Sequence, residues 1–241
     1  MIAGAPKEIF PGQNQVALAP EGAAALKKAG LGVMIQSGAG DSAGYPDDEY
    51  LKQGAEILPS REKVFERADI ILQYQAAGAN PEKGPEDYSL LRQGQTLIAF
   101  LDPLSAPEQV RELAKHGVTA FSMELMPRIT RAQSMDALSS MATVTGYKAV
   151  ILAAERLNRM FPLMMTAAGT VNAARVFVIG AGVAGLQAIS TARRLGAVVQ
   201  AYDVRPAVRE QVESLGGKFV EMELDAASSE TKGGYAREMS E

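Results

Sequence analysis

The sequence predicts an α/β fold built on parallel β-sheets, and two observations lead to this prediction. Short apolar strands alternate with helical segments along the first half of the chain, and a glycine-rich turn later joins another strand to a helix. Strands that alternate with helices form βαβ units, in which the strands pair in parallel. We therefore expect an N-terminal α/β domain at residues 1–135, a linking helix and loop at 136–170, and a second domain at 171–241.

The first domain is expected to hold four strands with helices between them. The apolar stretches that predict strands lie near Val33 and at 70–74, 96–101 and 118–123. Helical patterns fill 20–29, 47–54, 60–68 and 106–116, and Ser60 and Ser105 are suited to cap the last two. A longer helix is expected at 136–159, followed by a loop at 162–173 and a new strand from Arg175.

Composition excludes several classes of function. The chain has 241 residues, a net charge of -4, one histidine and no cysteine, so disulfides, thiol nucleophiles and cysteine-based metal sites are excluded. No basic run or nucleic-acid-binding motif is present. The N-terminus lacks the pattern of a secretory signal, and the apolar stretches fall far short of the ~20 residues of a membrane helix, so we expect a soluble chain.

The most informative motif is a G-x-G-x-x-G turn formed by Gly180, Gly182 and Gly185. It follows the β-branched strand 176–179 and opens a helical pattern. In such a motif the first glycine permits a tight turn, the second lets a pyrophosphate approach the backbone, and the third allows the helix to pack closely on the strand. The helix N-terminus also offers N–H groups to the phosphates. We expect dinucleotide binding here, in preference to a glycine-rich turn without a ligand.

Asp203 bears on the choice of nucleotide. It ends the next predicted strand, about 20 positions after the first glycine, where a carboxylate binds the adenosine ribose. A carboxylate accepts hydrogen bonds from the 2′-hydroxyl and repels a 2′-phosphate, which favours NAD. Arg205 complicates this prediction because an arginine can accommodate the phosphate. The strand-end position of Asp203 carries more weight.

A polar segment at 123–140, "MELMPRITRAQSMDALSS", precedes the long predicted helix. It contains two arginines, one glutamine, one aspartate and three serines. One interpretation is a domain-linking loop, in which Asp136 caps the helix that starts at Ala137. The other is a functional loop.

The residues resemble a known family. The segments "MELMPRITRAQSMDALSS", "FPLMMTAAGTV", "GAGVAGLQAISTARRLGA" and "EQVESLGGKF" are similar to those of the NAD(H)-binding component, domain I or alpha subunit, of proton-translocating NAD(P) transhydrogenases, which are related to alanine dehydrogenase. The resemblance covers almost the whole chain. It implies two Rossmann-like parallel-sheet domains with a cleft between them, and the second would be incomplete here, with only its first half present.

The resemblance also implies a set of site residues. It places Arg128, Gln133, Asp136 and Ser139 beside the nicotinamide, as the hydride-transfer site. It assigns NAD(H) binding to Gly180, Ala181, Gly182, Val183, Ala184, Gly185, Asp203, Val204, Arg205 and Tyr235. Tyr235 and Met239 match a mobile loop that closes over the nucleotide. No metal is implied.

The same resemblance implies partners. NADP(H) would be held by a separate domain, and a membrane domain would translocate protons. The component would be a homodimer, cytoplasmic and peripheral on the inner face of the membrane through its partner subunits.

Two alternatives remain at this point. Alanine dehydrogenase needs a proton-transferring Lys and His, but this chain has Gln73 and Gln75 in the first matching strand and Asp102 in the second. The single histidine, His116, is expected to end a helix at the surface. The family's arginine before "VA" is Gln15 here. Because few residues follow Asp203, the chain also resembles a truncated product, and a non-catalytic NAD-binding fragment is the second alternative.

Overall fold

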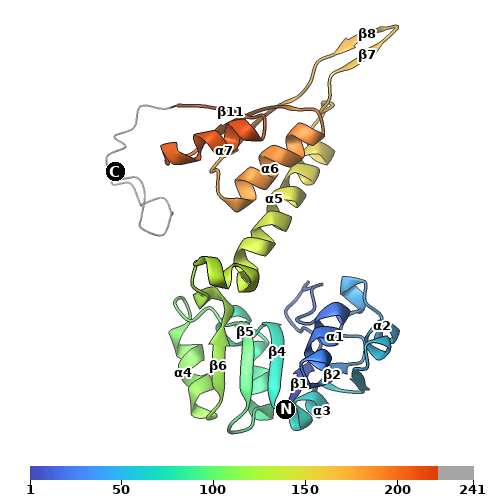
Figure 1. Cartoon of the computed structure of the whole chain (residues 1–241), viewed down its shortest axis with the longest axis vertical. Coiled ribbons are helices and arrows are strands. Elements are labelled where there is room, and N and C mark those ends of the chain that lie inside the picture. Colours follow the sequence, from blue (N-terminus) through green and yellow to red (C-terminus); the bar gives the residue numbers. More distant parts are fainter. Residues whose placement is uncertain (222–241) are drawn as a thin grey trace. The chain divides into compact units, whose positions relative to one another are not determined.

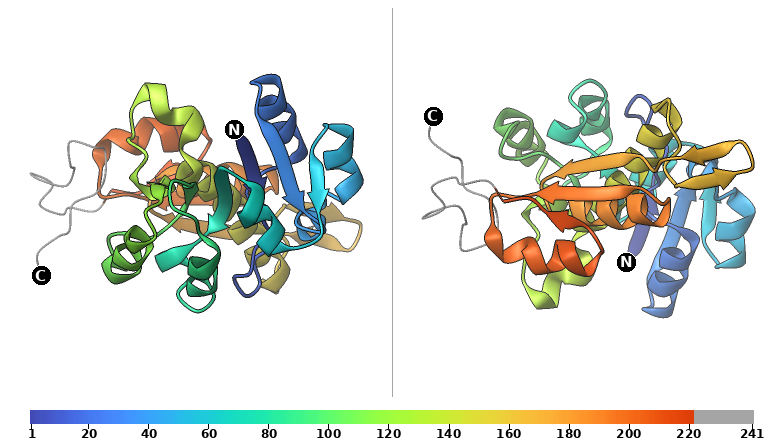
Figure 2. Two further views of the ribbon diagram at one scale, coloured as in Figure 1. Left: turned by 90° about the horizontal axis from the view of Figure 1, so that it is seen from below. Right: turned by 90° about the horizontal axis from the view of Figure 1, so that it is seen from above.

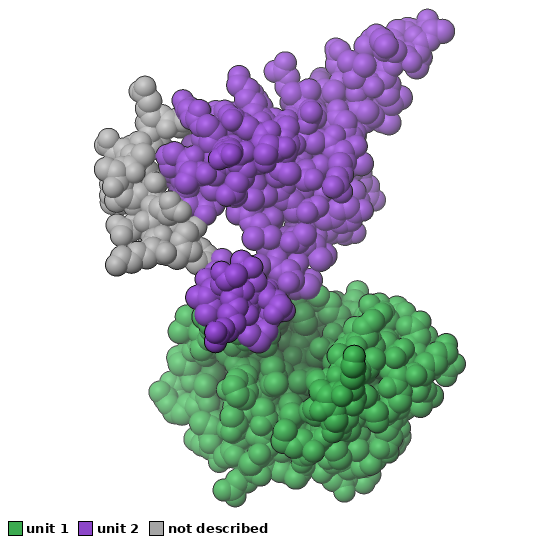
Figure 3. Space-filling view, in the orientation of Figure 1, with its two compact units in different colours: residues 1–127 green, residues 128–241 purple. Residues whose placement is uncertain are grey.

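The computed structural model describes residues 1–221 and contains two compact units. Unit 1 comprises Met1–Pro127 and unit 2 comprises Arg128–Glu241 (Figure 3). The long helix α5 (Ala137–Arg156) therefore belongs to unit 2, although the sequence suggested a separate linking segment.

Unit 1 contains a six-stranded parallel sheet (Figure 1). The strands are β1 (Ile2–Ala5), β2 (Gly32–Gln36), β3 (Glu56–Leu58), β4 (Ile70–Gln75), β5 (Thr96–Phe100) and β6 (Thr119–Ser122). Their order is β3-β2-β1-β4-β5-β6, and all five pairings are parallel. This is the strand order of a doubly wound Rossmann-like sheet, so the predicted α/β class is confirmed for this unit.

Four α-helices connect these strands. They are α1 (Pro20–Lys28), α2 (Asp47–Lys52), α3 (Arg61–Arg67) and α4 (Pro107–Lys115), with short 3-10 turns η1 (Asp41–Ala43), η2 (Ala77–Ala79), η3 (Gly84–Leu90) and η4 (Met123–Leu125). Ser60 caps α3, since its hydroxyl accepts a hydrogen bond from the Lys63 amide at 3.4 Å. The predicted Ser105 cap was wrong: α4 follows Ala106 without a side-chain cap, and Pro107 begins the helix.

The sheet of unit 1 is buried on both faces. Met34 packs with Val64 and Phe65 in one hydrophobic cluster. Its neighbours Val33 and Ile35 belong to a second cluster with α1 and α2 residues. Because successive strand side chains point to opposite faces, the two clusters lie on opposite sides of the sheet. Such two-sided burial is the packing that parallel strands require.

Unit 2 contains a smaller parallel sheet, ordered β11-β10-β9. Its elements are β9 (Arg175–Ile179), α6 (Val183–Arg194), β10 (Val198–Tyr202), η6 (Pro206–Val208), α7 (Arg209–Ser214) and β11 (Lys218–Phe219), preceded by η5 (Thr130–Met135) and α5. Ile189, Val199 and Val212 are buried in its core. On β9, Phe177 and Ile179 are exposed, whereas Val176 and Val178 pack into that core, so within residues 1–221 the helices cover one sheet face.

The segment expected to be a loop contains a hairpin. Strands β7 (Met164–Thr166) and β8 (Gly169–Val171) pair in antiparallel register and project away from the sheet and helices of unit 2 (Figures 1 and 2). Gly169, with a φ of +135°, closes the turn. Both strands are exposed along their length.

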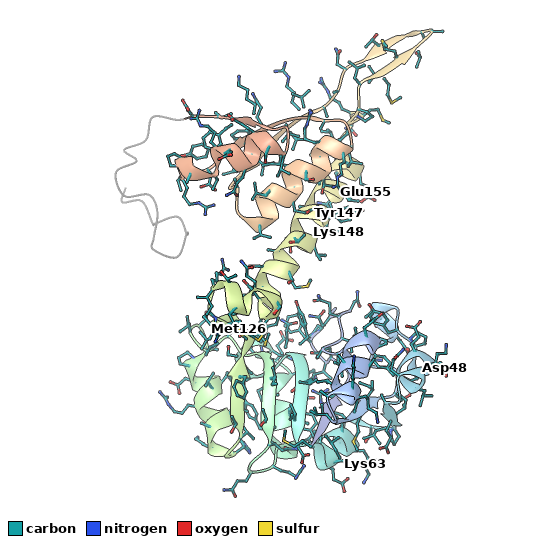
Figure 4. All side chains as sticks on the ribbon, in the orientation of Figure 1. Asp48, Lys63, Met126, Tyr147, Lys148 and Glu155 are labelled. Atoms are coloured by element: carbon teal, nitrogen blue, oxygen red, sulfur yellow. The ribbon has the colours of Figure 1, made fainter. Side chains whose placement is uncertain are left out.

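Helix α5 packs along α6 at a point of very close approach. A Cβ added to Gly146 would lie 2.1 Å from the carbonyl oxygen of Ala184. Among the described residues, α5 alone is long and apolar enough to span a membrane by length and composition, a test that helices of soluble proteins also pass. Figure 4 labels Tyr147, Lys148 and Glu155 along it. Its contact with α6 shows that it serves as a packing element of unit 2.

Candidate functional site

The glycine turn lies between β9 and α6, where the sequence placed it. Gly180 has a φ of +91°, a left-handed conformation that glycine adopts without steric cost. Its amide donates a hydrogen bond to the carbonyl of Tyr202 at 2.8 Å, which ties the turn to the end of β10. The strand therefore ends abruptly and the chain turns directly into the helix.

The other two glycines of the motif serve different purposes. A Cβ on Gly185 would lie 1.8 Å from the carbonyl oxygen of Gly180, so this position must be glycine for the helix to pack against the turn. A Cβ on Gly182 would meet no atom within 4 Å, so this glycine faces open space. The first amides of a helix have no intrahelical partner. The backbone at Gly182 is therefore accessible to an anionic ligand at the positive end of α6.

Asp203 follows β10 and connects its end to the glycine turn. Its Oδ2 accepts a hydrogen bond from the Ala181 amide at 2.7 Å, and the residue is only 8% exposed. Its Oδ1 accepts from the Arg205 amide at 2.8 Å and from Arg205 Nε at 2.9 Å, while Arg205 Nη2 donates to Oδ2 at 3.0 Å. Asp203 thus fixes the turn and also forms an ion pair with Arg205.

The hydrogen bonds of Asp203 set its charge state. Burial alone raises the pKa of a carboxyl group, because it disfavours the charged form. Donation by the Arg205 side chain, the Ala181 amide and the Arg205 amide more than offsets this effect, so the pKa of Asp203 lies below its ordinary value. The carboxylate is therefore charged at neutral pH, which makes it a strong acceptor for hydroxyl groups.

A cavity of about 390 Å³ joins the glycine turn to the polar segment within unit 2. Arg128 lines it from the start of the unit, and Leu138, Ser139 and Ala142 line it from α5. The opposite wall comprises Ile179, Gly180 and Gly182 to Gly185. Two motifs that are far apart in the chain thus share one concave surface, as is typical of small-molecule sites.

Asp136 caps α5, as the linking-loop interpretation required. Its Oδ1 accepts a hydrogen bond from the Ser139 amide at 2.9 Å, and its Oδ2 accepts from the Ser139 hydroxyl at 2.6 Å. These bonds, first that of the hydroxyl, lower the pKa of Asp136, and the positive charge of Arg128 lowers it further. Asp136 does not line the cavity, but it fixes the orientation of Ser139, which does.

The remaining candidates are not all at the cavity. Gln133 lies exposed on η5 and does not contribute to its wall. Val204 is half-buried between Asp203 and Arg205 and does not line the cavity either. Tyr235 and Met239 lie outside the described residues.

Residues of unit 1 that would matter to an amino-acid dehydrogenase are engaged in structural contacts. Gln75 accepts a hydrogen bond from Gln13 Nε2 at 2.7 Å and donates to the carbonyl of Ala79 at 3.2 Å. Gln73 donates to Asp87 at 2.9 Å. His116 ends α4, with its ring 5.7 Å from that of Tyr88.

Two further positions in unit 1 differ in conformation or partner from what the sequence could indicate. Asp102 has a φ of +49°, and its amide donates to Glu124 Oε1 at 2.7 Å. Gln15 forms a hydrogen bond with Tyr74; this bond lowers the pKa of Tyr74, although burial, the larger effect, raises it.

Sequence reasoning missed three lining residues and one pairing. Ile179, Leu138 and Ala142 are apolar residues of a strand and a helix, and no sequence pattern distinguishes them from core residues. The pairing of Arg205 with Asp203 was also missed, although the spacing of two residues after a strand end allowed both side chains to meet.

Comparison with known proteins adds the family. The family model of the alanine dehydrogenase/PNT N-terminal domain matches residues 4–145, and that of the alanine dehydrogenase/PNT C-terminal domain matches residues 149–239. The chain is 48% identical over 237 residues to the first of the polypeptides that form the NAD(P) transhydrogenase alpha subunit of Rhodospirillum rubrum, covering 98% of this chain and 62% of that relative.

Solved structures agree with this comparison. The transhydrogenase of Sinorhizobium meliloti superimposes with a TM-score of 0.86 at 50% identity, covering 92% of this chain and 62% of that one. An L-alanine dehydrogenase superimposes with a TM-score of 0.77 at 27% identity, covering 91% of this chain and 60% of that one. The chain thus spans about three-fifths of the length of these relatives.

Proposed function

Because this chain belongs to the alanine dehydrogenase/PNT family, we propose that it is the NAD(H)-binding component of a transhydrogenase. In this proposal the whole enzyme exchanges hydride between NAD(H) on this chain and NADP(H) on a partner domain, and couples the exchange to proton translocation by membrane subunits. The observation that carries the proposal is the cavity that places Arg128 and Ser139 opposite the glycine turn.

The residues present fit a dinucleotide. Open space at Gly182 and the N-terminus of α6 suit a pyrophosphate, and the charged Asp203 at the end of β10 suits a ribose diol. A bound nicotinamide would supply the hydride chemistry. The protein's own contribution would be to bind the nucleotide, to hold it in one orientation and to limit the access of water.

The polar segment would orient the nicotinamide end. Asp136 fixes Ser139 through two hydrogen bonds, and Ser139 faces the cavity beside Arg128. Gln133, exposed on η5, would be available to the carboxamide or to the partner's nucleotide. Hydride exchange needs reacting atoms within ~3–3.5 Å and correctly aligned. In this proposal the loop therefore affects the rate more than the affinity.

Alanine oxidation is the less suitable activity for this chain. It would need a group that accepts a proton from the amino acid. Gln75 is a neutral amide bonded to Gln13 and to the Ala79 carbonyl, and His116 stacks near Tyr88 at the end of α4. Hydride exchange between two nicotinamides needs no such acid or base.

A second candidate function is non-catalytic NAD binding. It is favoured by one observation, that the chain spans 62% of the length of its transhydrogenase relatives. The glycine turn and Asp203 would then bind the adenosine half of the nucleotide without supporting hydride transfer.

The proposal extends to assembly and location. The relatives are named as an alpha subunit, or as one of the polypeptides that form it, and these names support further components of the same enzyme as partners. We propose a homodimer that lies on the cytoplasmic side of the membrane and is attached through its partner subunits.

The test combines equilibrium titration with stopped-flow kinetics. The chain is titrated with NADH, then mixed with the NADP(H)-binding component of a transhydrogenase relative, and hydride transfer is followed by absorbance. Gln133→Ala should slow transfer at least tenfold while NADH affinity changes less than about threefold, which is below the ~1.4 kcal/mol of one decade. Gln53→Ala, at the exposed end of α2 in unit 1, is the matched control. NADH binding without transfer supports the second candidate, and absence of NADH binding refutes both.

A further inference from the structure

The carboxylate of Asp203 accepts as many hydrogen bonds as its geometry allows. A carboxylate offers about four lone-pair positions on its two oxygens. Oδ1 accepts from the amide and Nε of Arg205, and Oδ2 accepts from the amide of Ala181 and Nη2 of Arg205. All four positions are used, and the Asp203 side chain is only 6% exposed. A ribose hydroxyl can therefore bind this carboxylate only by replacing one of the present donors.

The four donors differ in how easily they can be replaced. The amides of Ala181 and Arg205 belong to the glycine turn and to the chain after β10, so they hold the carboxylate in place whatever the Arg205 side chain does. The donors Nε and Nη2 are at the end of a flexible side chain that is 15% exposed. The ribose diol would therefore take the positions of the guanidinium group, which leaves the guanidinium beside the ribose.

We propose that Asp203 and Arg205 form a coupled selectivity pair for the nucleotide. Asp203 selects a ribose 2′-hydroxyl, and by holding Arg205 it also withholds from the site the group that would bind a 2′-phosphate. A planar guanidinium binds phosphate oxygens through paired hydrogen bonds, as it now binds the carboxylate. Selection of NAD(H) over NADP(H) thus depends on repulsion by Asp203 and on its retention of Arg205. This inference rests on the proposed NAD(H) site.

The inference makes a prediction that simple repulsion does not. If Asp203 acted only by repelling a 2′-phosphate, then Asp203→Asn would weaken discrimination to the same extent whether or not an arginine stood at 205. If the pair is coupled, Asp203→Asn releases the guanidinium from its ion pair, and Arg205 then binds the phosphate. The gain in 2′-phosphate affinity then requires Arg205.

The experiment uses ligands that contact only the adenosine half of the site. The whole chain and its variants are titrated by calorimetry with ADP-ribose and with 2′-phospho-ADP-ribose. The variants are Asp203→Asn, Arg205→Gln and the double variant. We expect the wild-type chain to prefer ADP-ribose by at least tenfold, Asp203→Asn to bind 2′-phospho-ADP-ribose at least tenfold more tightly than wild type, and the double variant to lose that gain. Asp203→Asn keeps an oxygen acceptor for the Ala181 amide, and circular dichroism melting verifies that each variant is folded. Asp203→Ser replaces it if it is not.

Two results would overturn the inference alone. They are ADP-ribose binding by wild type with no gain of 2′-phosphate affinity in Asp203→Asn and Asp203→Ser, and a gain that persists in the double variant. If the wild-type chain binds neither ligand, the proposed nucleotide site is itself wrong, and this inference fails with it.

Discussion

Replacing Gly146 with alanine tests whether the contact between α5 and α6 determines the stability of unit 2. In an ordinary helix interior, alanine stabilises relative to glycine by ~0.8–1 kcal/mol. Here the new methyl carbon would lie 2.1 Å from the Ala184 carbonyl oxygen and 3.1 Å from its Cα. These are backbone atoms of α6, which cannot rotate away as a side chain can. The two helices must therefore separate.

The size of the effect follows from two opposing terms. Overpacking of a well-packed interior costs ~1–3 kcal/mol, and a clash with backbone belongs to the upper end of that range. After subtraction of the propensity gain, we expect Gly146→Ala to destabilise the α5–α6 pair by about 1–2 kcal/mol. That energy corresponds to a factor of roughly 5–30 in the population of the open state.

Hydrogen–deuterium exchange with mass spectrometry measures this locally, which suits a chain of two units. Peptides from α5 and α6 should exchange roughly 5–30 times faster in Gly146→Ala, whereas peptides from unit 1 should not change. Gly22→Ala on α1 is the matched control, because its new methyl would meet the end of the flexible Leu18 side chain at 2.8 Å. It should leave exchange in α1 unchanged or slow it. Unchanged or slower exchange in α5 of Gly146→Ala would refute the packing argument.

Three further predictions concern charge, capping and substrate. Asp136→Ala removes the cap of α5 and should cost ~1 kcal/mol, seen as faster exchange confined to the first turn of that helix; an unchanged first turn contradicts the cap. The lowered pKa of Asp203 gives unit 2 a stability contribution that is present above the unfolded value of ~3.9 and lost as pH falls toward the folded value. Urea titrations from acidic to neutral pH should therefore show a shallower pH dependence in Asp203→Asn than in wild type, and equal slopes would contradict it. Finally, the purified chain should form no NADH from NAD and alanine, and an alanine-dependent rise in NADH absorbance would contradict the roles given to Gln75 and His116.

The elements of the fold that the sequence predicted are those with strong local patterns. Strands β2, β4, β5 and β6 are apolar runs flanked by turns, and their positions agree with the structure within a residue or two. By contrast, β1 consists mostly of small residues and β3 is very short, and both owe their extended form to pairing with β2. Such pairing is a tertiary effect, which a local pattern does not contain.

The hairpin β7–β8 shows the same limit in another form. Its two short strands combine apolar, small and polar residues and lack the Asn-Gly or Asp-Gly turn that commonly identifies a hairpin. The sequence therefore predicted only a loop. At the site, the glycine turn was predictable because Gly180 and Gly185 are required by backbone geometry. The cavity was not predictable, because it arises where α5 meets the turn.

The position of α5 connects the two halves of the cavity. The glycine turn is rigid, because Gly185 packs on Gly180 and Asp203 anchors the Ala181 amide. Arg128 and Ser139 flank a segment with only short 3-10 structure before α5. Their placement relative to the turn therefore depends on the cap formed by Asp136 and on the contact of Gly146 with α6.

A substitution that moved α5 by even ~1 Å would retain every site residue and still misalign the reacting groups, a displacement that can reduce a rate ~100-fold. Gly146 does not itself line the cavity, yet it sets the distance between α5 and the start of α6. The residues that would bind ADP-ribose lie on the turn and at the end of β10, and their mutual geometry does not involve α5. It follows that Gly146→Ala should slow hydride transfer more strongly than it weakens the affinity for ADP-ribose, and equal losses in the two measurements would contradict this dependence on α5.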